Sequence, residues 1–368
     1  MMLESSITER QLIEQFLAAL RALPEVRAEL SNGKSTGANN DCGKYKYDVQ
    51  IDLQVAGKSF ILLLDAKKAV YPRDVREVLW QFREAGYGGL KGQDNPPLLV
   101  LVAEAISPGA KELLRHERVG YYDSGGSLYL AAPGAYFYVD KPLPKTLAKS
   151  VRSLFSGRRA QVLQVLLANH RNWFSVKALA AQALVSPATV SQVLSELARF
   201  EWLTPRGQGP TKERQLCEPT ALLDAWIKQL TLLRPLMLRR YYVPGTQSKN
   251  LLARMGNAFD SHEVSYAVSH EAAAQRYAPF LSSIPQVRTR LLMGAKADAA
   301  IVDLGARIVN EGANLVIIEA KSPGELLGRE QVDGIWLASP VQVYLDLLRG
   351  EGRSKEMAEH LRKEKIGF

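Results

Sequence analysis

The stretch that most constrains this chain lies near its middle, where residues 174–199 predict two short helices joined by a tight turn. Ser186 suits the N-cap of the second helix, and Pro187 suits its first residue. Apolar residues then recur at helical spacing and predict one buried stripe, made of Val190, Val193, Leu194 and Leu197. The opposite face carries small or polar side chains and one basic side chain: Ala188, Gln192, Ser195 and Arg199.

The flanking segments extend this pattern. A helix is expected at 158–169, and residues 202–216 predict a strand, a basic glycine-rich hairpin and a second strand. Three helices followed by a hairpin is the order of a winged helix-turn-helix. The small and polar face of the last helix suits entry into a groove of duplex DNA, where it would offer hydrogen bonds to base edges.

The distribution of charge favours the same interpretation. Residues 151–214 contain nine Lys and Arg against three Glu, so they carry +6 of the chain's formal +9. Clustered positive charge supplies the salt-dependent attraction to phosphate on which DNA binding depends. The alternative is a helical hairpin that only packs against its neighbours. The candidate DNA contacts are Ala188, Thr189, Ser191, Gln192, Ser195, Arg199, Arg206, Gln208, Lys212 and Arg214.

Length and composition bound the class of protein. At 368 residues the chain is longer than one ordinary domain, so two or three domains are expected. Its two cysteines, Cys42 and Cys217, have neither metal-ligand spacing nor the pattern of a disulfide framework. The N-terminus lacks a signal pattern, and the longest apolar runs are far shorter than a membrane span. These features predict a soluble, cytoplasmic protein with no membrane partner.

A hairpin near the N-terminus brings acidic residues together. Residues 47–55 alternate between polar and apolar side chains, which is typical of a strand, and residues 58–67 predict a second strand. The two-residue turn between them places Asp48 directly opposite Asp65. Lys67 shares the strand face of Asp65, because side chains two residues apart point the same way. Asp52 lies on the same face as Asp48 and is the alternative to Asp48 as the first acid of the site.

Two carboxylates opposed across a hairpin are destabilising unless something compensates their charge. Mg²⁺ would compensate it, because this ion binds one or two carboxylates together with water and phosphate oxygens. Asp48 and Asp65 are therefore the candidate metal ligands, and Lys67 could position or activate a water that attacks phosphate. The structural alternative is a surface ion pair between Asp48 and Lys67.

This spacing resembles the PD-(D/E)xK nuclease superfamily, which has the restriction-endonuclease-like fold. The resemblance implies that Asp48 is the first acid and that Asp65-Ala66-Lys67 is the (D/E)xK element. It also implies a catalytic Gln on the following helix, here Gln81, while Tyr47 precedes the first acid in place of Pro. A helix at 73–85 and an apolar strand at 97–103 fit such an αβ domain. Many domains of this fold keep only a scaffold role, so that alternative stays open.

The C-terminal part predicts a further α+β domain. Strands are expected at 236–243, 286–293, 299–302 and 315–321, and helices at 248–259, 339–348 and 354–363. Glu319-Ala320-Lys321, with Asp298 or Asp303 upstream, could form a second (D/E)xK element, and the alternative is an ordinary core strand. Tyr344 and Asp346 are expected to secure helix packing.

Two stretches of this region, residues 267–279 and 339–347, together with Gly352-Arg353 and Met357-Ala358, resemble the AbiEi-type antitoxins. These are the transcriptional-regulator half of type IV toxin–antitoxin systems. With the winged helix included, the resemblance spans residues 155–368. It implies promoter binding by the winged helix and a C-terminal domain that serves regulation or toxin neutralisation. The nuclease-like domain at the N-terminus departs from the usual picture of this family.

The sequence as a whole predicts an α/β and α+β multidomain protein. The expected domains are nuclease-like at 1–145, winged helix-turn-helix at 151–217, a connecting helix at 218–235 and AbiEi-like at 236–368. The leading hypothesis is a DNA-binding transcriptional regulator. The alternatives are a Mg²⁺-dependent DNA endonuclease targeted by the winged helix, and a protein-interaction scaffold that needs no DNA. Double-stranded DNA is the expected partner, and a cognate toxin and a homodimer are further candidates.

Overall fold

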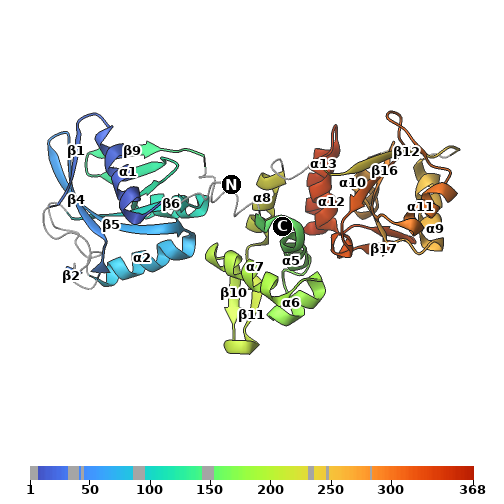
Figure 1. Cartoon of the computed structure of the whole chain (residues 1–368), viewed down its shortest axis with the longest axis horizontal. Helices are drawn as coiled ribbons and strands as arrows, with labels where there is room; N and C mark the ends of the chain where they lie inside the picture. The colour runs from blue at the N-terminus through green and yellow to red at the C-terminus, as the bar shows by residue number, and fades with distance from the viewer. Residues whose placement is uncertain are drawn as a thin grey trace. The chain divides into compact units, whose positions relative to one another are not determined.

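The chain is a mixed α/β protein built of two compact units (Figure 1). The computed structural model describes residues 7–31, 41–42, 45–85, 96–142, 153–230, 236–245, 248–281 and 284–368. The first unit comprises residues 1–151 and 198–201, and the second comprises residues 152–197 and 202–368. No helix within these described ranges is long and apolar enough to cross a membrane.

A seven-stranded sheet forms the centre of the first unit, in the order β1-β4-β5-β6-β7-β8-β9. Strands β5, β6 and β7 are parallel to one another, and the remaining neighbours are antiparallel. A separate short pair is formed by β2 (Asp41–Cys42) and β3 (Tyr45–Lys46). The strands of the sheet are β1 (Val26–Leu30), β4 (Val49–Val55), β5 (Lys58–Val70), β6 (Leu98–Ile106), β7 (Gly120–Asp123), β8 (Leu128–Ala132) and β9 (Ala135–Val139).

Helices cover both faces of this sheet, as Figure 1 shows. Helix α1 (Glu9–Arg21) buries Phe16 and Leu20 in a core with Leu62. Helices α2 (Pro72–Glu84) and α3 (Pro108–His116) form a second core on the other face. Burial on both faces explains the continuous apolar runs of β5 and β6, since a central strand has no solvent-facing side.

The hairpin of β4 and β5 has the expected register. Its pairs run from Val49 with Leu64 to Val55 with Lys58, so the turn is the two residues Ala56 and Gly57. Gly57 has a φ of +80°, a conformation that glycine adopts at no steric cost. The prediction of this hairpin is confirmed over these pairs. Asp48 precedes the paired residues, and its amide donates to the Leu64 carbonyl at 2.8 Å, so the position predicted for it across from Asp65 lies just beyond the paired register. Strand β5 extends beyond the expected end, to Val70.

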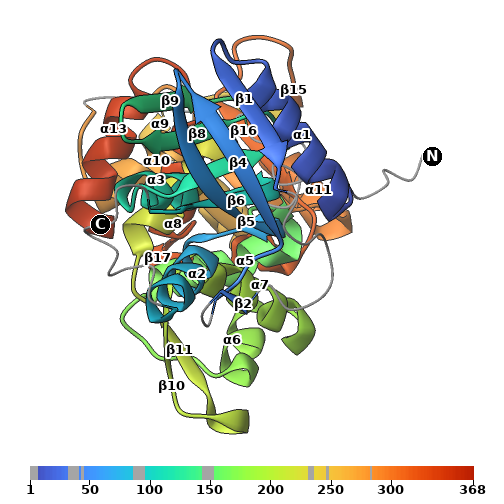
Figure 2. The ribbon, with the colours of Figure 1, turned by 90° about the vertical axis from the view of Figure 1, so that its left-hand side faces the viewer.

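Three helices and a hairpin open the second unit (Figure 2). Ser175 caps α6, and Ser186 accepts a hydrogen bond from the Thr189 amide at the start of α7. An isolated bridge between Phe174 and Arg214 adds a third strand segment to the hairpin. The elements are α5 (Gly157–Ala168), α6 (Val176–Ala183), α7 (Pro187–Arg199), β10 (Leu203–Arg206), the 3₁₀ turn η2 (Gly209–Thr211), β11 (Glu213–Leu216) and then α8 (Pro219–Leu230).

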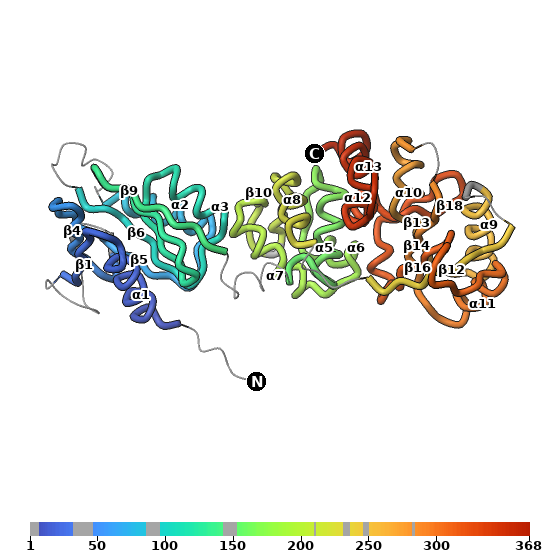
Figure 3. Tube along the Cα trace, turned by 90° about the horizontal axis from the view of Figure 1, so that it is seen from above, coloured from blue at the N-terminus to red at the C-terminus, as the bar shows by residue number. Residues whose placement is uncertain are grey.

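The rest of the second unit is built on another seven-stranded sheet, in the order β15-β12-β16-β14-β13-β18-β17. Its strands are β12 (Leu238–Tyr242), β13 (Tyr266–Ser269), β14 (Val287–Leu292), β15 (Arg307–Ile308), β16 (Leu315–Ala320), β17 (Glu330–Val332) and β18 (Ile335–Leu337). Its helical segments are α9 (Ser248–Ser261), α10 (His270–Tyr277), α11 (Ala295–Asp303), η3 (Pro323–Leu326), α12 (Pro340–Leu347), α13 (Ser354–Leu361) and the π-helical η4 (Arg362–Ile366). Helices α12 and α13 lie side by side (Figure 3).

One strand prediction in this region is wrong. Residues 299–302 belong to helix α11, not to a strand. Ala297, Ala300 and Ile301 are buried, which is the i, i+3, i+4 pattern of one helix face. Four alanines within nine residues favour a helix, and a four-residue window was too short to reveal this period.

The turn between α6 and α7 stores backbone strain at Leu184. This residue has a φ of 53° and a ψ of 42°, and its side chain is 59% exposed, so it gains little packing there. A non-glycine residue in this left-handed conformation costs about 1–2 kcal/mol.

Leu184→Gly is therefore expected to raise the free energy of unfolding by about 1 kcal/mol, measured in urea. As a control, Ala181→Gly inside α6 should lower it by about 1 kcal/mol. Equal effects of the two changes would contradict this reasoning.

Candidate functional site

The exposed face of α7 is a strip of small and polar side chains. Ala188, Ser191, Gln192 and Ser195 are all exposed. At 100° per residue they fall within about 100° of one another around the helix axis. The opposite side of α7 is anchored by Val190, Val193, Leu194 and Leu197, all of which are buried. A helix held by one apolar stripe leaves its other face available to a partner.

An arginine from α5 joins this strip. One guanidinium nitrogen of Arg159 donates to the Gln192 amide oxygen at 3.2 Å, and the other lies 3.0 Å from Glu196. Thr189 is partly buried, and its hydroxyl lies 3.0 Å from the Ser186 hydroxyl, so it serves the cap of α7. Arg159 is not among the contacts that the sequence predicts. The sequence signal for such a role is that Arg159 lies in the basic segment. Its contact with Gln192 depends on the fold, which brings α5 beside α7.

The candidate DNA contacts on the hairpin differ in how exposed they are and in whether they are held by other side chains. Gln208 and Lys212 are exposed near the tip, while Arg214 is half-buried. Arg206 forms an ion pair with Glu213 at 2.6 Å, and its guanidinium lies 4.3 Å from the Trp173 ring centroid. Arg199 is the last residue of α7, and as one of residues 198–201 it belongs to the first compact unit. Lys212 is therefore the hairpin cation best placed to attract phosphate.

The first unit brings Asp48, Asp65 and Lys67 together at the end of the hairpin. One Asp48 carboxylate oxygen accepts a hydrogen bond from the Ala66 amide at 2.7 Å. The Lys67 ammonium lies 3.1 Å from the Asp65 carboxylate, whose side chain is only 13% exposed. The lysine therefore pairs with Asp65, and the surface ion pair considered between Asp48 and Lys67 is not the pair that forms.

Asp52, the other acid considered for that site, lies apart from it. Asp52 pairs with Ile61 in the hairpin register, four residues from Asp65, which is roughly 13 Å along the strand. Gln81 is exposed on α2. Within the ranges that the structure describes, no group of three or more His, Cys, Asp or Glu side chains is arranged to hold a metal ion. Among the described residues, Asp48 and Asp65 would thus be the carboxylates at such a site, and Mg²⁺ is commonly bound by one or two carboxylates.

The second (D/E)xK element has a structural explanation. Glu319 pairs with Arg239 on the neighbouring strand β12, whereas Asp303 lies 3.6 Å from His262. Asp298 is exposed in the first turn of α11. The acids of this motif thus belong to separate contacts, as expected of an ordinary core strand.

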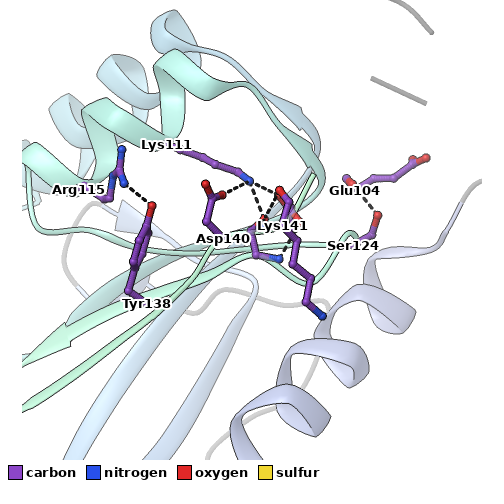
Figure 4. A network of polar contacts seen from close by, with 9 residues as sticks. Glu104, Lys111, Arg115, Ser124, Tyr138, Asp140 and Lys141 are labelled. Atoms are coloured by element: carbon purple, nitrogen blue, oxygen red, sulfur yellow. Dashed lines mark hydrogen bonds and ion pairs between the residues drawn. The ribbon is translucent and has the colours of Figure 1, made fainter. Parts of the chain in front are cut away.

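A buried polar network that the sequence did not indicate lies beside β7 (Figure 4). The Lys111 ammonium lies 2.7 Å from both Asp123 and the Ser127 hydroxyl, and 3.6 Å from Asp140. The side chains of Lys111 and Asp123 are 8% and 0% exposed. Arg115 donates to the Tyr138 hydroxyl at 2.6 Å. Because these contacts join α3 to the strands beneath it, the network secures this helix on the sheet.

A second buried network organises the C-terminal part. Arg290 donates to both oxygens of Asp346, at 3.0 and 2.5 Å, and Ser269 donates to the same carboxylate. Gln342 also donates to Asp346, at 2.8 Å. The Arg290 and Asp346 side chains are 6% and 2% exposed. Asp346 therefore has the packing role expected from the sequence, and it joins the stretches 267–279 and 339–347.

Comparisons of the chain with models of protein families, with curated proteins and with solved structures found no match. The chemistry of the described residues is therefore the basis for the functional argument.

The buried carboxylate of Asp346 makes stability depend on pH. Burial raises its pKa, but Arg290 and the hydrogen bonds from Arg290 and Ser269 outweigh burial and hold the pKa below its usual 3.8. A lowered folded-state pKa stabilises the fold above the unfolded pKa, and this stabilisation is lost as the pH falls through the folded pKa. Asp346→Asn should lower the free energy of unfolding at pH 7 by about 3–5 kcal/mol, because Arg290 loses its buried partner.

The difference between Asp346→Asn and the unchanged chain should stay nearly constant as urea unfolding is repeated down to pH 5, and it should shrink at about pH 3 and below. Asp333→Asn is the matched control, because Asp333 is 78% exposed in its ion pair with Arg276. That change should cost less than about 1 kcal/mol. A difference that stays constant with pH would show that the Asp346 charge does not stabilise the fold.

Proposed function

We propose that this chain is a sequence-specific DNA-binding transcriptional regulator of the AbiEi antitoxin type. Its DNA-binding module is a winged helix-turn-helix at residues 151–217, with α7 as the recognition helix and the β10–β11 hairpin as the wing. The exposed strip on α7 carries this proposal. A helix that follows a tight, capped turn and exposes only small and polar side chains fits the major groove, where such side chains read base edges.

The roles of the individual residues follow from their chemistry. The Gln192 amide can bond to adenine in a bidentate way, and Ser191 and Ser195 can bond to either kind of base edge. Lys212 and Gln208 would contact backbone phosphate, which positions the protein without reading sequence. The basic character of residues 151–214 supports attraction to duplex DNA.

The C-terminal part supports the AbiEi portion of the proposal. The two stretches that resemble this family meet at the Asp346 carboxylate, through Ser269 from one and Gln342 from the other. Such a domain would serve regulation or the neutralisation of a cognate toxin. A palindromic operator would call for a homodimer.

Substitutions on α7 and the wing test this function. Duplexes selected from a random pool by the unchanged protein define its preferred site. Gln192→Ala should reduce the preference for that site over altered duplexes by about 1–3 kcal/mol, because base contacts carry specificity. Lys212→Ala should weaken binding to all duplexes evenly and lower the salt slope by about 1. Binding would be measured by fluorescence anisotropy at several salt concentrations.

Lys228→Ala is the control for these variants, because Lys228 is exposed on α8, outside the three helices and the hairpin. It should bind as the unchanged protein does. If Gln192→Ala and Lys212→Ala also leave affinity, preference and salt slope unchanged, α7 and the wing are not the DNA-binding surface.

A second candidate function is that of a Mg²⁺-dependent DNA endonuclease of the PD-(D/E)xK class. The observation that favours it is the meeting of Asp48, Asp65 and Lys67 beside the start of β4, at the open end of the hairpin. Asp48 and Asp65 would hold the ion, which supplies charge stabilisation at phosphate when bound. Lys67 would orient the attacking water, and its ion pair with Asp65 keeps the ammonium beside that carboxylate.

Cleavage of supercoiled plasmid tests the second candidate. With Mg²⁺ or Mn²⁺ the unchanged chain should nick the plasmid, and a chelator should stop it. The double variant Asp65→Ala/Lys67→Ala should lose about a hundredfold or more in rate, because both a ligand and the water-positioning group are removed. Asp52→Ala, which alters an exposed acid of the same hairpin, should cleave normally. Plasmid that stays intact with both metals would remove this candidate and leave the DNA-binding proposal untouched.

A further inference from the structure

A cavity of about 620 Å³ lies within the second unit, lined by α5 and α8 on one side and by β14, η3 and α12 on the other. Its polar lining includes Gln164, Arg290, Lys321, Asp346 and Arg349. A volume of this size falls in the usual range for small-molecule sites, which often occur where two domains meet. It joins the proposed DNA-binding module to the C-terminal part.

The charges of the cavity are only partly compensated. Three basic residues and two acidic residues line it. Arg290 is neutralised by Asp346, but no ion pair within the described part of the chain involves Lys321 or Arg349. Arg349 is half-buried and donates to the Leu230 carbonyl at 3.2 Å. Burial lowers its pKa, so the charged guanidinium is under-solvated and an anion beside it would be stabilised.

An unpaired amide indicates that the cavity also offers an acceptor. Gln164 is 8% exposed, and its side-chain oxygen is buried with no hydrogen-bond partner among the described residues. Its amide nitrogen donates to Gln342. A buried acceptor without a partner costs free energy that a ligand's hydroxyl or amino group would recover.

The remaining wall is apolar. Phe155, Trp226, Leu230, Leu236 and Leu345 line the cavity beside the charged groups. Phe155 and Trp226 pack against each other with their ring centroids 5.8 Å apart. An apolar wall with a few convergent polar groups favours a ligand that has an apolar body and a charged end.

We propose that this cavity binds a small organic anion, a carboxylate or phosphate monoester on an apolar ring, and that this ligand regulates DNA binding. Lys321 and Arg349 bind the acidic group, and the aromatic wall packs against the ring. Gln164 accepts a hydrogen bond from a hydroxyl or amino group where the ligand carries one. The regulatory part of this proposal rests on the proposed DNA-binding function; the binding part does not.

The route from ligand to DNA is the polar chain that crosses the cavity. Gln164 on α5 bonds to Gln342 on α12, and Gln342 bonds to Asp346. On the other side of α5, Arg159 bonds to Gln192 of α7. A ligand held by both walls therefore restrains α5 against α12, and α5 in turn contacts the recognition strip.

Calorimetry on the full chain tests binding without DNA. The probes are AMP and benzoate, each with its uncharged counterpart, adenosine and benzyl alcohol, and inorganic phosphate tests the anion alone. At least one acidic probe should bind with a Kd below about 1 mM, and at least about tenfold more tightly than its counterpart and than phosphate. AMP and benzoate distinguish a phosphate ligand from a carboxylate ligand. Failure of both acidic probes would overturn the proposal.

Variants locate the site. Lys321→Met and Arg349→Met should each weaken binding of the acidic probe about tenfold, since each removes one charge-assisted contact. Lys321 is exposed, so its replacement tests the site even if Arg349→Met does not fold. Lys228→Met, outside the cavity, should bind the probe normally. Wild-type affinity in Lys321→Met would overturn the assignment of the site.

The DNA readout separates the two proposals. The bound probe should change the DNA affinity of the unchanged chain at least about threefold, and it should do so less in Lys321→Met. Probe binding with unchanged DNA affinity would overturn the regulatory role. A chain that binds the probe but no DNA would overturn the proposed function and leave the cavity as a ligand site.

Discussion

The buried carboxylate of Asp346 is the interaction on which most of the second unit depends. It accepts from Arg290 on β14, Ser269 at the end of β13 and Gln342 on its own helix α12. A buried charge is tolerated only when such partners surround it, because desolvation costs several kcal/mol per ion. The sheet and α12 must therefore pack in the arrangement that brings these partners to Asp346. Through Gln342 and Gln164 the same network reaches α5, so the position of the three helices is linked to this core.

Local patterns predicted much of the fold, because they depend on neighbours in the chain. The alternation at 47–55 and the turn at Ala56-Gly57 predicted the register of β4 and β5, and the stripe on α7 is buried as expected. Long-range pairing could not be predicted in the same way. Nothing near Lys111 in the sequence indicates Asp123 as its partner, and nothing near Gln192 indicates Arg159. The strand predicted at 299–302 failed because a helix overrode a short apolar window.

The acidic site of the first unit shows that the register of a hairpin fixes where side chains lie but not which chemical role they have. Opposed carboxylates on a hairpin require compensation, and here two protein groups provide part of it: the Ala66 amide for Asp48 and the Lys67 ammonium for Asp65. This partial compensation lowers the cost of holding the two acids close together when no metal is bound. Conversely, Mg²⁺ needs few protein ligands when phosphate oxygens complete its shell. The same two carboxylates therefore suit both a structural hairpin and a Mg²⁺ site that phosphate completes.

The positive charge of the proposed DNA-binding module attracts DNA over a shorter distance than its net charge suggests. Residues 151–214 carry +6, yet two of the cations near α7 and the hairpin strands are held by carboxylates: Arg159 by Glu196 and Arg206 by Glu213. Such pairs contribute dipoles at short range and little long-range attraction. Exposed lysines such as Lys212 would then supply the nonspecific attraction, while discrimination would depend on the uncharged strip of Ser191, Gln192 and Ser195. Because Arg159 also bonds to Gln192, reading a base with this amide requires Gln192 to exchange an internal partner for the DNA. A ligand that changes the position of α5 would change how readily Gln192 leaves Arg159 for a base. Such a ligand would therefore change sequence preference as well as affinity.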